Sequence, residues 1–125
     1  MSQSYPELID DLNAAIGTLR AGAPGTMKAF SALAREALAP GQLDVKTKEL
    51  LGLVASMVLR CDDCISYHVA QCREAGVSRD EMFEAFSVGL VVGGSIVIPH
   101  MRRAVDFLDQ LEQGDAAAPA AHDHG

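Results

Sequence analysis

Apolar residues recur every three to four positions through most of the chain, and no stretch alternates with the period of two that strands show. Glycine, proline and capping residues divide this pattern into six segments. These segments predict helices over about 5–20, 24–39, 44–59, 61–75 and 78–92, and a sixth helix from 95 or 99 to 113. The sequence therefore predicts an all-α fold, a compact bundle of about six helices that occupies residues 1–114 as a single domain.

Three helix boundaries have specific capping signals. Asp44 is a typical N-cap for the third segment, and Ser78 with Glu81 forms a capping box for the fifth. Gly76 is a left-handed cap that ends the fourth segment. Residues 115–125 are of low complexity and offer nothing to bury. We therefore expect them to form a mobile, solvated tail that includes the last two histidines, His122 and His124.

Composition and charge narrow the possible partners. Hydrophobic residues make up 49% of the chain and aromatic residues only 5%, so we expect a core of aliphatic side chains and methionine. The net charge is −7, and the excess acid lies near the two ends. Without a basic patch we expect no nucleic-acid partner. The start of the chain is polar rather than signal-like, and residues 86–99, the longest apolar stretch, are shorter than the about 20 residues of a membrane span. We therefore expect a cytoplasmic protein that does not bind a membrane.

The candidate chemistry lies in one helix, where Cys61, Cys64 and His68 fall within about 60° of one another. Thiols three residues apart can close a disulfide across one helical turn. His68, one turn after Cys64, can take the thiol proton or stabilise the thiolate. The positive end of the helix dipole favours the thiolate as well. This arrangement predicts a redox-active cysteine pair, because a reducing cytoplasm would keep it from being a structural bridge.

A carboxylate at Glu49 is placed to join this group. A turn at Arg60 would fold the fourth helix back on the third, and Glu49 and His68 then lie at similar depths along their helices. We expect them to touch, directly or through water. Gly52 and Ser56 are small enough to let the two helices approach closely. A carboxylate on His68 would orient the imidazole and raise its basicity.

Glu49, Cys61, Cys64 and His68 together fit the pattern E-x11-C-x2-C-x3-H. Over about 43–107 the chain resembles the alkylhydroperoxidase D-like branch of the carboxymuconolactone decarboxylase superfamily. The resemblance implies an all-α fold, homotrimers or homohexamers, and thiol-dependent reduction of peroxides. It implies that Cys64 attacks the peroxide, that Cys61 resolves the product as a disulfide, and that Glu49 and His68 relay the proton. An external dithiol would reduce the disulfide, and no cofactor is required.

One position departs from that family pattern. Asp63 stands where members of the branch often have a second histidine, and Asp62 beside it adds another negative charge. Like charges next to the thiols would raise the thiol pKa values and oppose the helix dipole. Slow peroxidase turnover, or a substrate other than a simple peroxide, is therefore expected. Two alternatives stay open: a carboxymuconolactone decarboxylase-like enzyme that uses Glu49 and His68 alone, and a member that binds a small ligand and lacks peroxidase activity.

The other cysteine and the remaining histidine have simpler interpretations. Cys72 shares the face of Cys61 but lies about 16 Å farther along the helix, too far for one tetrahedral metal site. We expect no metal, and we expect Cys72 to be a small buried residue. His100 is expected to be a packed or interface histidine rather than a catalytic one.

An apolar segment predicts how the chain assembles. Residues 90–98 are too apolar to be an exposed surface of so small a domain. The last helix also has a second stripe beside its core face: Ile96, His100, Arg103 and Phe107. We therefore expect the fifth and sixth helices to form a subunit interface that closes a homotrimer or homohexamer.

Overall fold

The computed structural model describes residues 5–117, and over this range the chain forms six α-helices and one short 3-10 helix. The helices are α1 (Tyr5–Gly22), α2 (Pro24–Leu38), α3 (Val45–Leu59), α4 (Asp62–Glu74), α5 (Arg79–Gly93), η1 (Ser95–Val97) and α6 (Ile98–Ala117). The predicted all-α fold is confirmed, and most boundaries agree with the sequence pattern to within a few residues.

The capping signals form the hydrogen bonds that the sequence predicts. The Asp44 carboxylate accepts the backbone N–H of Thr47 at 2.8 Å, and this interaction holds the pKa of Asp44 below its usual value. Ser78 and Glu81 cap α5 reciprocally, each side chain accepting a backbone N–H of the other residue. Gly76 adopts φ +87°, the left-handed conformation expected of it after α4. Local sequence therefore sets where α3, α4 and α5 begin or end.

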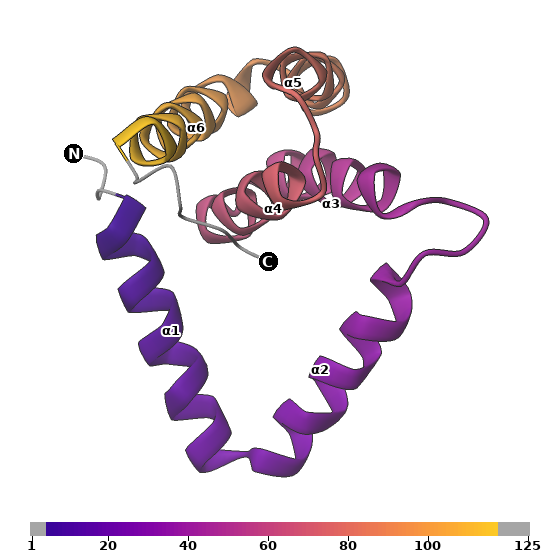
Figure 1. Ribbon diagram of the computed structural model, residues 1–125, viewed down its shortest axis with the longest axis vertical. Coiled ribbons are helices and arrows are strands. Elements are labelled where there is room, and N and C mark those ends of the chain that lie inside the picture. Colours follow the sequence, from indigo (N-terminus) through magenta and orange to yellow (C-terminus); the bar gives the residue numbers. More distant parts are fainter. Residues whose placement is uncertain (1–4, 118–125) are drawn as a thin grey trace.

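Helices α3 to α6 pack around one core, seen in the upper half of Figure 1. α3 lies against both α4 and α5, and α6 covers α4. The core is mostly aliphatic, with two methionines and two phenylalanine rings, as the composition predicts. Its largest fully buried side chains are Phe86, Leu53, Met57, Ile65, Met82 and Leu108.

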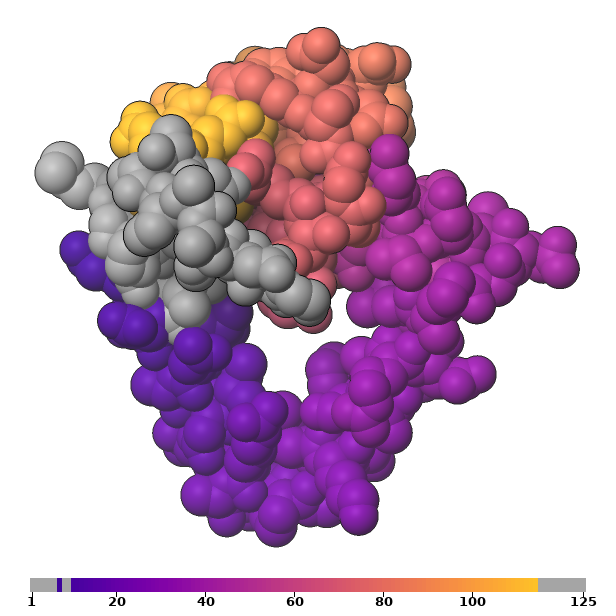
Figure 2. Space-filling view, in the orientation of Figure 1, coloured from indigo at the N-terminus to yellow at the C-terminus, as the bar shows by residue number. Residues whose placement is uncertain are grey.

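Helices α1 and α2 form a V-shaped arm beside this core (Figure 1). No residue of α2 is buried, and Phe30 and Leu33 on its apolar face are 61% and 64% exposed. Figure 2 shows open space between the two limbs of the arm. Lys48 ties the end of α2 to α3, because its Nζ donates to the carbonyls of Ala37 and Ala39 at 3.0 and 2.6 Å. The compact part of the fold is thus four helices rather than six.

The second stripe of α6 lies differently from what the sequence suggests. Phe107 is buried inside the chain, and both His100 and Arg103 bind Asp62 at the start of α4. Ile96 alone among the four residues is exposed. The prediction that this stripe forms a subunit interface is therefore wrong for Phe107, because α6 packs across α4 on that side, and it stays a prediction for the other three residues.

The described residues contain no helix with both the length and the apolarity of a bilayer span. α6 continues to Ala117, into the segment 115–125 that the sequence predicts as a tail. The rest of that segment, with His122 and His124, lies outside the described residues.

Candidate active site

A left-handed turn at Arg60 joins α3 and α4 into a hairpin. Arg60 has φ 59° and ψ 41°, and its backbone N–H donates to the carbonyl of Met57 at 3.0 Å. The N–H of the next residue, Cys61, donates to Ser56 at 3.1 Å. These two bonds end α3 and reverse the chain within one residue. The hairpin that the sequence predicts is therefore present.

Glu49 on α3 and His68 on α4 meet directly across this hairpin. Glu49 Oε1 lies 2.8 Å from His68 Nδ1, and the two side chains are only 6% and 17% exposed. An ionised carboxylate can only accept a hydrogen bond, so in this pair Nδ1 carries the proton. The lone pair of Nε2 then remains available, which suits His68 for accepting a proton. The predicted contact between the two residues is confirmed.

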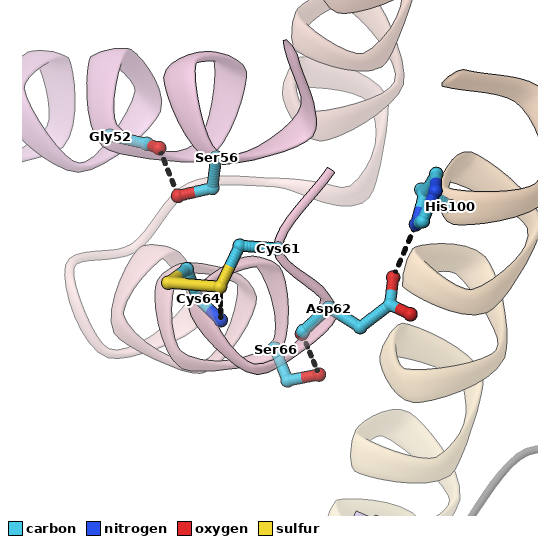
Figure 3. Close-up of a disulfide and its surroundings, with 7 residues drawn as sticks. All are labelled: Gly52, Ser56, Cys61, Asp62, Cys64, Ser66 and His100. Carbon is cyan, nitrogen blue, oxygen red and sulfur yellow. Dashed lines mark hydrogen bonds and ion pairs between the residues drawn. A yellow bond between two sulfur atoms is a disulfide. The ribbon is translucent and has the colours of Figure 1, made fainter. Parts of the chain in front are cut away.

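Gly52 makes room for the His68 ring. A Cβ atom added at Gly52 would lie 2.6 Å from Cε1 and 2.9 Å from both ring nitrogens of His68. The imidazole therefore rests directly on the backbone of α3. Ser56, one turn later, donates its hydroxyl to the Gly52 carbonyl at 2.7 Å (Figure 3). The small residues allow the close approach that the sequence predicts.

The cysteine pair lies at the N-terminus of α4. Cys61 and Cys64 form a disulfide, with their Cα atoms 5.3 Å apart (Figure 3). Cys61 is the N-cap residue, and its Sγ accepts the backbone N–H of Cys64 at 3.3 Å. Cys64 is exposed, whereas Cys61 is half-buried. The pairing expected from the spacing of the two cysteines is therefore present, and Cys64 is the more exposed residue of the two.

Cys72 is the free cysteine of the described chain, and it is fully buried. Burial, with a smaller contribution from the negative charge of Glu49, raises the pKa of the Cys72 thiol to about 12. The thiol is therefore neutral at physiological pH. The prediction of a small buried residue is confirmed.

A cluster on the other side of the cysteine motif was not predicted from the sequence. Asp62 Oδ1 lies 2.7 Å from His100 Nδ1, and Arg103 Nη1 donates to Asp62 Oδ2 at 2.7 Å. Figure 3 shows the Asp62 side chain pointing toward α6 and away from the disulfide. Asp62 is therefore not the uncompensated charge that the sequence suggests, whereas Asp63 is exposed. The spacing of three between His100 and Arg103 was the available signal, since it puts both on one helix face.

The site thus contains a cysteine pair that forms a disulfide and an imidazole oriented by a buried carboxylate. A partly exposed aromatic ring lies beside the imidazole. That ring belongs to Tyr67, whose edge approaches His68 with centroids 5.3 Å apart. Among residues 5–117 there is no group of three or more His, Cys, Asp or Glu side chains placed to hold a metal ion. The chemistry that these residues can support is thiol–disulfide exchange coupled to proton transfer.

Comparison with known proteins shows which family the chain is similar to. The model of the carboxymuconolactone decarboxylase family matches residues 24–107 of the chain. An uncharacterised protein of the cox locus of Paracoccus denitrificans is 34% identical over 101 residues, which are 80% of this chain and 90% of that protein.

Two crystal structures show the same fold. TM1620 from Thermotoga maritima is 47% identical with a TM-score of 0.83, covering 90% of this chain and 98% of that one. The apo form of lpg0406 from Legionella pneumophila, a carboxymuconolactone decarboxylase family protein, is 28% identical with a TM-score of 0.75, covering 87% and 95%. TM1620 has a second crystal structure, in which it is described as a carboxymuconolactone decarboxylase family protein. Its involvement in an antioxidative response has been suggested there.

Proposed function

Because the chain belongs to the carboxymuconolactone decarboxylase family, we propose that it is a thiol-dependent peroxidase of the alkylhydroperoxidase D type. The observation that carries this proposal is the hairpin geometry. A cysteine pair that can form a disulfide begins the same helix on which His68 is held by Glu49 at 2.8 Å. A family member that used only the carboxylate and the imidazole would have no need of the paired cysteines.

The reaction that we propose has three balanced steps. The Cys64 thiolate attacks a peroxide oxygen and the O–O bond breaks. An alcohol leaves, and Cys64 becomes a sulfenic acid. The Cys61 thiol then attacks the Cys64 sulfur, which forms the disulfide and releases water. An external dithiol reduces the disulfide by exchange and is itself oxidised to a disulfide.

His68 supplies the proton transfers in this cycle. Its Nε2 accepts the proton of the Cys64 thiol, and the resulting imidazolium returns a proton to the alkoxide that leaves. Glu49 fixes the tautomer and stabilises the imidazolium. Two features support Cys64 rather than Cys61 as the attacking sulfur: Cys64 is the exposed one, and it lies one turn from His68.

Peroxide consumption with a dithiol reductant tests the proposal. We expect Cys64→Ser to abolish turnover and Cys72→Ala, at a buried cysteine outside the site, to leave it within about twofold. Trapping of sulfenic acid identifies the attacking sulfur. The trap should label Cys64 in the Cys61→Ser protein. Label on Cys61 in the Cys64→Ser protein, with none on Cys64, would reverse the assignment.

The buried Glu49–His68 pair also supports a second candidate, a decarboxylase-like enzyme that needs no thiol. A Cys61→Ser/Cys64→Ser double variant separates the two candidates. Lactone or keto-acid turnover that survives in this variant, together with no peroxide consumption by the unaltered protein, would favour the second. Ligand binding without turnover of either substrate class would favour a small-ligand-binding member.

We further propose that the protein works in the cytoplasm as a homotrimer or homohexamer. Supporting this, five apolar residues near the end of α5 and the start of α6 are about half exposed or more: Val88, Val91, Val92, Ile96 and Ile98. Exposed apolar side chains that are concentrated in one segment of so small a domain are typical of a contact surface. The apolar face of α2 adds to it. Light scattering at micromolar concentration checks the assembly, and a monomer mass would contradict it.

A further inference from the structure

Asp62 creates a conflict at the start of α4. As the first helical residue it lies at the positive end of the helix dipole, where a carboxylate stabilises the helix. The same residue stands between the two cysteines, where a negative charge disfavours the thiolate that the proposed reaction needs. One charge therefore helps the helix and hinders the chemistry.

Two side chains of α6 bind the Asp62 carboxylate and offset its charge. Each carboxylate oxygen of Asp62 has its own partner, His100 Nδ1 and Arg103 Nη1, both at 2.7 Å. The three side chains are partly buried, with exposed fractions of 31% for Asp62, 19% for His100 and 34% for Arg103. A charge-assisted hydrogen bond at this distance both balances the charge and fixes the carboxylate. Figure 3 shows that carboxylate turned away from the sulfurs.

We propose that Arg103, held with His100 against Asp62, is a positioning residue of the redox site: it neutralises Asp62 and so keeps Cys64 able to ionise near neutral pH. The inference rests on the proposed function only in taking the Cys64 thiolate as the reacting species. Arg103 acts through Asp62 and does not itself touch the reacting atoms.

Several charged or titratable groups lie in the cysteine motif or on the elements that adjoin it, and all of them bear on the ionisation of Cys64. They come from α3, from the turn before α4, from α4 itself and from α6: Glu49, Arg60, Asp62, Asp63, His68, His100 and Arg103. Of these, Arg103 is the cation that bonds a carboxylate inside the motif. Removing it exposes one additional negative charge next to the thiol and leaves the other groups unchanged.

The test titrates a single thiol. In a Cys61→Ser background serine keeps the N-cap position, which it favours strongly. Cys72 does not ionise until about pH 12 because its thiol pKa is raised to about 12. The pH dependence of the rate of thiol alkylation, to which ionised tyrosines do not contribute as they do to the absorbance near 240 nm, therefore follows Cys64 alone. The measurement uses reduced protein without peroxide, so it can succeed or fail independently of peroxidase activity.

We expect Arg103→Gln to move the Cys64 titration midpoint upward by about 0.5–1 pH unit, which slows alkylation near pH 7 about 3- to 10-fold. Asp62→Asn should move the midpoint downward by a similar amount. The double variant Asp62→Asn/Arg103→Gln should return close to the starting value. Opposite shifts that cancel are the signature of charge neutralisation, and a merely structural role would not produce them.

Two matched variants complete the experiment. Arg102→Gln removes the neighbouring arginine, which is 62% exposed and bonds Asp106, and should leave the midpoint unchanged. Arg103→Lys keeps the charge and should largely restore the midpoint, and it serves if Arg103→Gln fails to fold. An unchanged midpoint in folded Arg103→Gln, or an upward shift in Asp62→Asn, overturns the proposal. A Cys64 midpoint that stays raised in Asp62→Asn/Arg103→Gln also overturns the proposal, because Arg103 would then act without Asp62.

Discussion

Two carboxylate–histidine pairs hold α4 to its neighbours, and they differ in burial and in what else the carboxylate binds. Glu49 and His68 meet at 2.8 Å in the α3–α4 interface, with the Glu49 side chain 6% exposed. Asp62 and His100 meet at 2.7 Å between α4 and α6, but Asp62 is 31% exposed and also binds Arg103.

The difference separates two roles for the same pair of residue types. A buried carboxylate bonded to Nδ1 fixes the tautomer of the imidazole and leaves Nε2 free to accept a proton, which suits His68 for proton transfer. A carboxylate already paired with arginine has its charge balanced, so His100 adds orientation rather than basicity. The first pair is therefore expected to govern the rate, and the second to govern the ionisation of the thiols beside it.

Removing each histidine in turn tests this division of roles with the largest expected effect. We expect His68→Asn to lower peroxide turnover about 10²- to 10⁴-fold, because the general acid–base group is lost. His100→Asn should lower it within about tenfold, since the Asp62–Arg103 ion pair persists. Steady-state rates with one peroxide and one dithiol, measured on variants with unchanged helical content, make the comparison. Equal losses in the two variants would contradict the division of roles.

The buried side of α4 near Glu49 also differs from the exposed start of the helix in thiol reactivity. Raising a thiol pKa from 9.0 to about 12 lowers its thiolate fraction at pH 8 about a thousandfold. We expect reduced native protein to react through two thiols and unfolded protein through three. Thiol counting with and without denaturant checks this. Rapid modification of Cys72 in the folded protein would show that this side of α4 is open to solvent.

The same buried thiol predicts a pH dependence of stability. The folded chain keeps the Cys72 proton to a higher pH than the unfolded chain does, because the folded pKa is the higher one. Stability from this residue is therefore complete below about pH 9 and is lost as the pH rises toward about 12. Cys72→Ala should flatten that part of the profile in denaturant titrations. A profile that is identical in both proteins would contradict the assignment.

Whether the sequence predicts each of these two pairs depends on how far apart the two partners lie along the chain. Glu49 and His68 lie on consecutive helices joined by one turn, so helix rise alone places them at equal depth. Asp62 and Arg103 lie on α4 and α6, and their contact depends on how α6 packs across the bundle. The periodicity of apolar residues and the capping residues at helix ends carry no information about that packing. For the same reason the pattern of α6 predicts Phe107 at a subunit interface, although it is buried within the chain.

The arm of α1 and α2 shows a related limit. The periodic apolar residues of α2 predict a helix correctly, but they also predict burial, and Phe30 and Leu33 are exposed in the single chain. Periodicity indicates that a helix face is to be covered, not what covers it. Residues that form helix ends, by contrast, act locally, and Asp44 and Ser78 therefore cap their helices as predicted.

The Glu49–His68 pair can be loosened without changing either residue. An alanine at Gly52 would put its Cβ 2.6 Å from the His68 ring, so the ring must move. Because the ring is the outer part of a flexible side chain, we expect more loss of turnover, about 10- to 100-fold, than of stability. Gly17→Ala in α1 is the control, since a Cβ there meets no atom within 4 Å. A Gly52→Ala protein with full activity would show that the close contact is not needed.

The smallest effect concerns the turn that sets the depth at which Glu49 meets His68. Arg60 is the one non-glycine residue with positive φ in the described chain, and a side chain in this conformation costs about 1 kcal/mol or slightly more. Arg60→Gly and Arg60→Ala remove the same charge, so the difference between them isolates the backbone. We expect the glycine variant to be more stable than the alanine variant by about 0.5–1 kcal/mol, because the flexibility of glycine in the unfolded chain offsets part of the gain. Urea midpoints with unchanged slopes measure the difference. Equal stabilities of the two variants would mean that residue 60 does not have to adopt the left-handed conformation. The depth at which Glu49 and His68 meet would then depend on their own side chains rather than on this turn.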